Sequence, residues 1–175
     1  MLGIETGGKV MNEDVYNMSM PIGDRLLFLD NLARISKTSL KDIYESTVDD
    51  DFSLDELKLV SKSLYKYKDI NGLYDFTDLL EMFIDRGVIP KLHTLIVDEA
   101  QDLSNLQWQV VHRVASNAEH VYAAGDDDQA IYRWAGASVE NFINLKGNKK
   151  VLDQSYRVPQ EAHKLATSLL DNIKD

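Results

Sequence analysis

Acidic side chains gather in the segment LIVDEAQD, residues 95–102, where a hydrophobic run ends abruptly at Asp98 and Glu99. Adjacent carboxylates suit nucleotide hydrolysis, because one can hold Mg²⁺, usually through water, while the other orients or deprotonates the attacking water. The alternative is that Asp98 and Glu99 only cap a helix or pair with surface cations. An isolated Asp-Glu pair does not decide between the two.

Two further polar clusters also follow predicted strands. Residues 121–124 predict a strand that Gly125 stops, and the acidic segment GDDDQ, residues 125–129, comes next. A third strand is predicted over residues 150–152 and is followed by DQSYR, residues 153–157. In an open parallel sheet, ligands bind beyond the carboxyl ends of the strands. We therefore expect all three strand ends to deliver polar groups to one edge, which indicates a nucleotide site more strongly than any single motif.

Two of these polar residues could act on a phosphate group. Arg157 would supply a planar cation to the γ-phosphate oxygens, where charge spreads in the transition state. Gln129 could sense the same phosphate through a neutral hydrogen bond. A metal-dependent nuclease built on Asp98, Asp126 and Asp128 is a weaker alternative, because the lysine or histidine that such sites usually carry is missing nearby.

The elements that position these residues predict an α/β fold. Residues 94–97 form a short continuous apolar run, as expected of a strand that is covered on both faces. Residues 104–117 predict a helix before the second strand, and residues 159–173 predict a final helix with Pro159 in its first turn. Strand, helix, strand, and then strand and helix, is the pattern of a parallel sheet.

The first half of the chain, residues 1 to about 90, predicts helices and little chemistry. Ser53 and Glu56 form a capping-box pattern that opens one helix, and Asp75 can cap another that Gly87 ends. An earlier helix is predicted by apolar residues at helical spacing: Leu26, Leu27, Leu29, Leu32 and Ile35. The helix after Asp75 is expected to turn its apolar residues inward: Phe76, Leu79, Leu80, Phe83 and Ile84.

Composition limits the classes of protein that fit. The 175 residues suffice for one domain or for a domain with an insertion. The chain has no cysteine, which excludes disulfides and fits a reducing, intracellular compartment. It lacks a run of 18 apolar residues, so neither a transmembrane helix nor a membrane partner is expected. The net charge of −10 argues against a protein that coats DNA phosphates, so nucleic-acid contact must be local or must depend on stacking.

Three segments resemble motifs II, III and IV of the UvrD/Rep/PcrA superfamily 1 DNA helicases: LIVDEAQD, AAGDDDQAIYRWAGA (residues 123–137) and LDQSYR (residues 152–157). YDFTDLL, residues 74–80, resembles the segment that this family carries shortly before motif II. The order and spacing of the four segments make the resemblance specific. It implies that residues 74–175 are the C-terminal part of a RecA-like P-loop NTPase domain with a parallel sheet, and that residues 1–73 are a helical insertion-like subdomain on its N-terminal side.

The resemblance also implies catalytic roles and cofactors. Asp98 would be the Walker B aspartate linked to Mg²⁺, and Glu99 would be the catalytic base. Gln129 would contact the γ-phosphate of ATP and couple it to DNA. Arg157 would be the motif IV arginine that touches the γ-phosphate. ATP and Mg²⁺ are therefore the implied cofactors.

A DNA-binding role is implied for Tyr132, Arg133 and Trp134. The two aromatic side chains would stack on the bases of single-stranded DNA. Such stacking contributes about 1–3 kcal/mol per base and requires no basic surface, which reconciles DNA binding with an acidic chain. Ordinary core packing is the alternative for both aromatics. The family often has a second arginine where Ala135 stands, so one possible DNA contact is missing.

This family requires a Walker A loop, G-x-x-x-x-G-K-[ST], to hold the phosphates. The near-match at residues 3–9 fails, because Val10 stands where the Mg²⁺-binding hydroxyl belongs. We therefore expect an internal piece of a helicase that is inactive alone and whose partners are single-stranded DNA and the remainder of the helicase chain. Unpaired strand edges invite self-association. The rival hypothesis is a non-catalytic module that only binds single-stranded DNA or a partner protein.

Overall fold

The computed structural model describes residues 4–7, 20–47, 50–152 and 158–173 of the chain. The chain divides into two compact units, Met1–Leu145 and Lys146–Asp175. The predicted boundary between the helical subdomain and the RecA-like domain, at residue 73, lies within the first unit and stays a prediction. None of the helices in the described ranges is long and apolar enough to cross a membrane.

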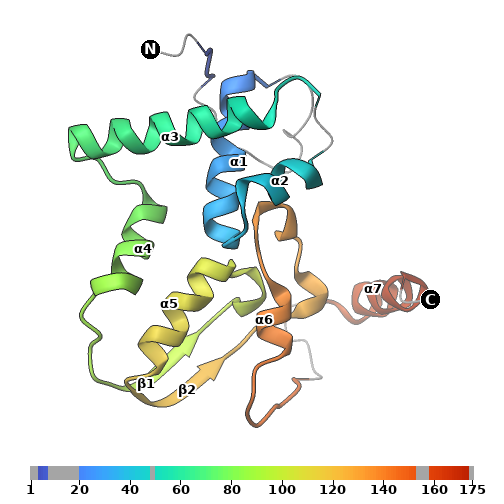
Figure 1. Ribbon diagram of the computed structural model, residues 1–175. Coiled ribbons are helices and arrows are strands. Elements are labelled where there is room, and N and C mark those ends of the chain that lie inside the picture. Colours follow the sequence, from blue (N-terminus) through green and yellow to red (C-terminus); the bar gives the residue numbers. More distant parts are fainter. Residues whose placement is uncertain (1–3, 8–19, 48–49, 153–157, 174–175) are drawn as a thin grey trace. The chain divides into compact units, whose positions relative to one another are not determined.

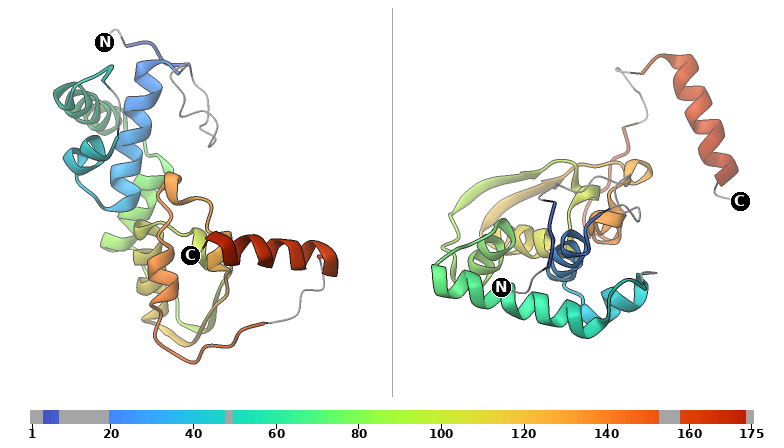
Figure 2. Two further views of the ribbon diagram at one scale, coloured as in Figure 1. Left: turned by 90° about the vertical axis from the view of Figure 1, so that its right-hand side faces the viewer. Right: turned by 90° about the horizontal axis from the view of Figure 1, so that it is seen from above.

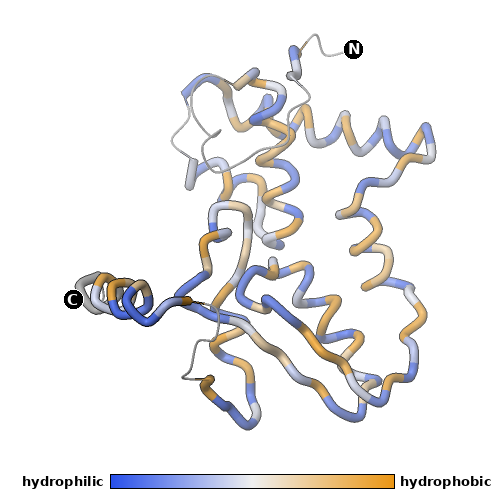
Figure 3. Tube along the Cα trace, turned by 180° about the vertical axis from the view of Figure 1, so that it is seen from behind, coloured by the Kyte–Doolittle hydropathy of each residue, from blue (hydrophilic) through white to orange (hydrophobic). Residues whose placement is uncertain are grey.

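Within the described ranges of the first unit, four helices precede the strands, and their order is shown in Figure 1. They are α1 (Ile22–Ser36), α2 (Leu40–Ser46), α3 (Leu54–Asn71) and α4 (Phe76–Arg86). The first three lie side by side in both views of Figure 2. Hydrophobic and hydrophilic residues alternate along α3 in Figure 3, so one of its faces can pack against α1. The expectation of a helical first half is confirmed.

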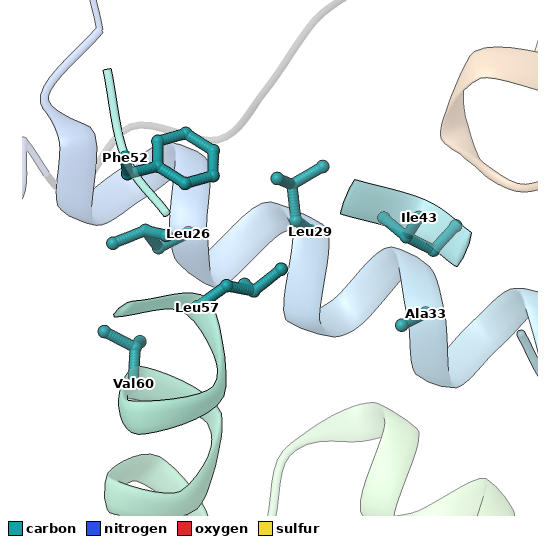
Figure 4. Close-up of a cluster of buried hydrophobic side chains, with 7 residues drawn as sticks. All are labelled: Leu26, Leu29, Ala33, Ile43, Phe52, Leu57 and Val60. Carbon is teal, nitrogen blue, oxygen red and sulfur yellow. The ribbon is translucent and has the colours of Figure 1, made fainter. Parts of the chain in front are cut away.

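A cluster of buried side chains, which we call the helical core, joins α1, α2 and α3. Figure 4 shows its residues along α1 and on the neighbouring segments: Leu26, Leu29, Ala33, Ile43, Phe52, Leu57 and Val60. Partly buried residues of α1 and α2 pack against this cluster: Leu27, Phe28, Leu32, Leu40 and Tyr44. The apolar spacing along α1 therefore marks the face that the helix buries.

The predicted helix caps are confirmed. The Ser53 hydroxyl accepts a hydrogen bond from the Glu56 amide at 3.3 Å, and the Ser53 amide donates to a Glu56 carboxylate oxygen at 2.7 Å. Asp75 and Asp78 form the same reciprocal pair at the start of α4. At the other end, the Gly87 amide donates to the Phe83 carbonyl at 2.9 Å. These local bonds satisfy backbone groups that the helix ends would otherwise leave unpaired.

An ion-pair network, which we call the α4 network, ties the start of α4 to its neighbours. Arg34 of α1 donates to Asp75 and Glu81 at 2.9 Å each, and Lys68 of α3 donates to Asp75 at 2.8 Å and to Asp78 at 2.7 Å. Burial alone would raise the pKa of Asp75. The hydrogen bonds from Lys68, the Asp78 amide and Arg34 outweigh burial and lower that pKa below its ordinary value.

The predicted inward face of α4 is wrong at two positions. Phe76 is 88% exposed and Leu79 is also exposed, whereas the partly buried Leu80, Phe83 and Ile84 agree with the prediction. Thr77 takes the buried position in the first turn, where its hydroxyl donates to Asn31 of α1 at 2.7 Å. The α4 network and this bond set the rotation of the helix, which apolar content alone did not reveal.

Two parallel strands form the sheet of the described residues. They are β1 (Leu92–Val97) and β2 (Ala118–Ala123), and α5 (Asn105–Ala115) connects them. The register places Leu95 opposite Val121 and Ile96 opposite Tyr122. Ser104 and Gln107 form the predicted capping box at the start of α5, which lies alongside the strands in Figure 1. The α/β character and the parallel pairing are confirmed.

The two faces of this sheet differ in burial. On one face, Val97, Ala100 and Trp108 form a small buried cluster, which we call the sheet core. On the other face, Ile96 is 71% exposed and its register partner Tyr122 is 59% exposed. The prediction that β1 is covered on both faces is therefore wrong, because α5 covers a single face within the described ranges.

The third predicted strand, over residues 150–152, is also wrong. This segment has no regular structure, and Val151 and Leu152 are exposed. The described part of the second unit holds no strand that could pair with it, and a lone extended segment gains no ladder hydrogen bonds. The predicted final helix is confirmed as α7 (Gln160–Ile173), whose first turn includes the bond from the His163 amide to the Pro159 carbonyl.

Candidate functional site

The two predicted catalytic carboxylates lie in the turn that follows β1. Asp98 and Glu99 are both exposed, and an Asp98 carboxylate oxygen accepts the Glu99 amide at 3.0 Å. Glu99 has a left-handed backbone with φ of 48°, an uncommon conformation for a residue other than glycine. The Ala100 amide then donates to the Ala124 carbonyl at 2.9 Å. The turn is therefore fixed from the end of β2, and it presents both carboxylates to solvent.

Gln101 connects the turn after β1 to the turn after β2. Its side chain is 2% exposed, and its amide nitrogen donates to Glu99 Oε2 at 2.9 Å and to Asp102 Oδ2 at 3.3 Å. Its amide oxygen accepts from the Asp126 backbone nitrogen at 3.1 Å. A buried amide with donors and acceptor engaged holds a single orientation. Gln101 therefore couples the position of Glu99 to the second turn.

Gly125 makes this connection sterically possible. A Cβ atom at Gly125 would lie 2.4 Å from the Gln101 amide oxygen and 3.2 Å from the Ala100 backbone nitrogen. Both distances are shorter than ordinary carbon contacts, and the second involves backbone that cannot move aside. The predicted role of Gly125 in stopping β2 therefore extends to the close approach of the two turns.

In the turn after β2, the side chain of Gln129 is bound to the carboxylate of Asp126. The short helix η3 (Asp127–Gln129) follows Asp126, which accepts from the Asp128 amide at 3.1 Å and from the Gln129 side-chain nitrogen. Asp126 therefore orders this turn internally, and Gln101 anchors it at the Asp126 amide. The exposed Gln129 lies at the same end of the sheet as Glu99. Hydrogen bonds through Gln101 and Asp126 connect the two residues.

Asp102 adds a third carboxylate to the turn after β1. Its Oδ1 atom is buried without a hydrogen-bond partner among the described residues. Burial, and then the neighbouring Glu99, raise the pKa of Asp102 above its ordinary value. Carboxylates that crowd a strand end create a site of negative potential, which favours a bound cation.

The arrangement fits Mg²⁺ held by few protein ligands. Mg²⁺ prefers oxygen ligands and keeps several waters, so one or two carboxylates and the phosphates of a nucleotide suffice. The described residues contain no group of three or more histidine, aspartate or glutamate side chains that could hold a metal ion. Asp98, Asp126 and Asp128 therefore do not assemble the cluster that the nuclease alternative requires, whereas Asp98 beside Glu99 remains suited to a nucleotide-bound cation.

The predicted DNA-binding residues occupy different environments. Tyr132 is 48% exposed, and Arg133 forms an exposed ion pair with Glu140 at 2.8 Å. Trp134 is partly buried and stacks on Phe28 of α1, with 6.3 Å between ring centroids and 24° between ring planes. Tyr132 is thus open to a ligand, and Trp134 combines protein packing with partial exposure.

Arg157 lies outside the described residues, so its predicted phosphate contact stays a prediction. Two contacts of the described site were not predicted. Gln101 carried a weak signal, because a neutral amide between acidic residues at a strand end suits a bridging hydrogen bond. The stacking of Phe28 on Trp134 carried none, because the two residues are far apart in the sequence.

Comparison with known proteins matches residues 27–150 to the family described as UvrD/REP helicase N-terminal domain. DNA helicase II of Salmonella typhimurium is 36% identical over 115 residues, which cover 58% of this chain and 16% of the relative. DNA helicase II of Escherichia coli is 35% identical over 115 residues with the same coverage. ATP-dependent DNA helicase Rep of Buchnera aphidicola subsp. Acyrthosiphon pisum is 37% identical over 87 residues, which cover 47% of this chain and 14% of the relative. The matched segments thus span 14–16% of the length of these three relatives.

Proposed function

The chain belongs to the UvrD/REP helicase N-terminal domain family, and we propose that it carries the catalytic carboxylates and single-strand-binding aromatics of an ATP-dependent DNA helicase. The observation that supports this most is the Gln101 side chain, which links Glu99 to the Asp126 amide. A site that hydrolyses ATP and moves DNA needs a mechanical link between the two functions. Gln101 provides a continuous, buried connection of that kind.

The carboxylates of Asp98 and Glu99, together with Arg157, have proposed chemical roles. Asp98 would hold Mg²⁺, and the charge of the ion would stabilise the phosphate oxygens of bound ATP. Glu99 orients the attacking water and accepts its proton, and the hydrogen bond from Gln101 Nε2 leaves the other carboxylate oxygen, Oε1, for that water. Arg157 provides the cation for the γ-phosphate, where negative charge develops in the transition state.

The second turn transmits the state of the nucleotide. Gln129 contacts the γ-phosphate in this proposal, which requires its side chain to leave Asp126. Such a change alters the turn that leads directly to Tyr132 and Trp134. In the whole enzyme, a RecA-like sheet would place both turns at one edge, and ATP binding and release would move single-stranded DNA past the aromatic residues.

The rival proposal is a module that binds single-stranded DNA or a protein without catalysis. The sequence favours this rival for the 175 residues, because they contain no complete Walker A loop, G-x-x-x-x-G-K-[ST]. We therefore propose that the chain by itself does not turn over ATP, and that phosphate binding requires a Walker A loop supplied by other sequence.

The test is ATP hydrolysis by the purified chain with Mg²⁺, with and without single-stranded DNA, beside Glu99→Gln. The glutamine keeps the shape of Glu99 but cannot accept the proton, so it isolates the catalytic role. We expect no turnover in either sample. Turnover that disappears in Glu99→Gln would support Glu99 as the base and contradict the proposed incompleteness, whereas turnover that survives would contradict the assignment of the base.

A further inference from the structure

The aromatic loop, defined here as residues 132–137, packs directly on α1. Its Trp134 indole stacks on the ring of Phe28, at a centroid distance of 6.3 Å. Phe28 also belongs to the layer of partly buried residues that packs against the helical core. The Trp134 ring is therefore connected through one side chain to a well-packed part of the first unit.

The same loop approaches α1 closely at a second point. Gly136 has φ of +92°, and a Cβ atom there would lie 3.0 Å from side-chain atoms of both Ile35 and Ser36. The Ser36 carbonyl in turn accepts a hydrogen bond from the Asn105 side chain at 2.8 Å. The glycine thus serves both the left-handed backbone and the close approach. The loop is held against α1 at two sites, one through stacking and one through close packing.

Among the described residues, the Trp134 indole is held by ring packing and not by a hydrogen bond from its nitrogen. Its Nε1 atom is buried and makes no hydrogen bond with any described residue. A buried indole nitrogen usually has a hydrogen-bond partner, so its absence removes the contact that most often fixes such a ring. Phe28 is the aromatic side chain in contact with this ring among the described residues.

We propose that Phe28 is a positioning residue for single-stranded DNA, because it holds the Trp134 indole in the orientation that a base stacks on. The inference rests on the proposed DNA contact of Trp134 and assigns a role within it to α1. A ring that is fixed before binding loses less conformational freedom when a base stacks on it, which strengthens binding without a new contact. Phe28 itself need not touch the DNA.

The chain offers an internal control, because it contains two tryptophans. Trp108 lies in the sheet core and has no ring contact with Phe28. In protein labelled with 5-fluorotryptophan, the ¹⁹F spectrum therefore reports Trp134 and Trp108 separately, and Trp134→Phe assigns the two signals. The Trp108 signal shows whether a variant keeps its fold, while the Trp134 signal shows whether its ring has moved.

Phe28→Ala is the test variant, Phe28→Tyr the conservative variant, and Leu32→Ala the matched control. Leu32 is on the same helix and in the same partly buried layer as Phe28. We expect Phe28→Ala to shift the Trp134 signal without DNA, to keep the Trp108 signal, and to weaken binding of an oligothymidylate of about 16 nucleotides by roughly five- to tenfold. Phe28→Tyr should restore both properties, and Leu32→Ala should leave both near wild type.

Several results would overturn the inference. An unchanged Trp134 signal and unchanged affinity in Phe28→Ala would remove the positioning role. A shifted signal with unchanged affinity would show that Phe28 packs on Trp134 but does not serve DNA binding. A failure of Trp134→Ala to weaken binding would instead contradict the proposed DNA contact of Trp134 itself, while the DNA-free spectrum would still report whether Phe28 positions the ring.

Discussion

Seven buried hydrophobic side chains form the helical core between α1, α2 and α3, whereas three form the sheet core beside β1 and β2, among the described residues. The helical region closes its core with its own elements, and its helices α3 and α4 begin at reciprocal caps. The sheet region leaves the face of Ile96 and Tyr122 open, and its most ordered contacts are the polar bonds around Gln101. Stability is therefore concentrated in the helices, and the candidate chemistry is concentrated where hydrophobic packing is thin.

The largest effect is expected in the helical core. Leu57→Ala should lower the free energy of unfolding by about 2–5 kcal/mol, because the fully buried side chain leaves a cavity. Urea denaturation measures this loss. The control is Leu59→Ala on the same helix, where the side chain is half exposed and the loss should be much smaller. Equal losses at the two positions would contradict the described core.

A smaller effect is expected at the link between the two turns. Gln101→Leu should cost about 1–3 kcal/mol, because it leaves the Asp126 amide and the Glu99 carboxylate without their partner. Hydrogen exchange of the Asp126 amide should become faster than in the wild type. Gln109→Leu makes the same substitution at an exposed position of α5 and should not change that exchange. Protection of the Asp126 amide that survives in Gln101→Leu would remove the proposed connection.

The α4 network should make part of the stability depend on pH. The pKa of Asp75 is lowered in the folded protein, so its contribution is complete above its ordinary value of 3.8 and is lost as the pH falls through the folded pKa. Asp75→Asn, which retains a good helix cap, should therefore destabilise at pH 7 and lose this effect in strong acid. Urea denaturation at several pH values measures the difference.

Asp55→Asn provides the control for that series, because the Asp55 side chain is almost fully exposed in the first turn of α3. Its stability difference from the wild type should stay small at every pH. A difference for Asp75→Asn that is constant between pH 7 and strong acid would show that the network does not stabilise the ionised form of Asp75.

The smallest effect on stability is expected on the open face of the sheet. Ile96→Ser should change the free energy of unfolding by no more than about 0.5 kcal/mol, because the side chain is already exposed. The same substitution should reduce self-association, which an exposed apolar strand face promotes. Light scattering over a range of protein concentrations tests this. A wild-type mass that stays monomeric at all concentrations would contradict the predicted self-association.

Local patterns in the sequence predicted the helix caps and the two strands. The caps at Ser53, Asp75 and Ser104 depend on residues three positions apart, so they could be read from the sequence. The two strands followed from short apolar runs that end in polar residues. Their parallel pairing followed from the helix between them. The resemblance to the helicase motifs then supplied the family, which the comparison with known proteins confirmed.

The predictions that were wrong depended on long-range contacts. Burial of both faces of β1 and a strand over residues 150–152 required neighbouring layers and strands that the described residues do not provide. The exposure of Phe76 follows from the way the α4 network orients α4. The stacking of Trp134 on Phe28 joins positions that are distant in sequence, so no local pattern could indicate it.

The most direct test of the account is the affinity of the purified chain for a fluorescently labelled oligothymidylate, compared between wild type and Trp134→Ala by anisotropy. We expect the loss of one stacking side chain to weaken binding by roughly five- to 150-fold. Tyr122→Ala, which removes an exposed aromatic from the open sheet face, should bind like the wild type. Equal affinity of the wild type and Trp134→Ala would contradict the claim that this loop binds single-stranded DNA.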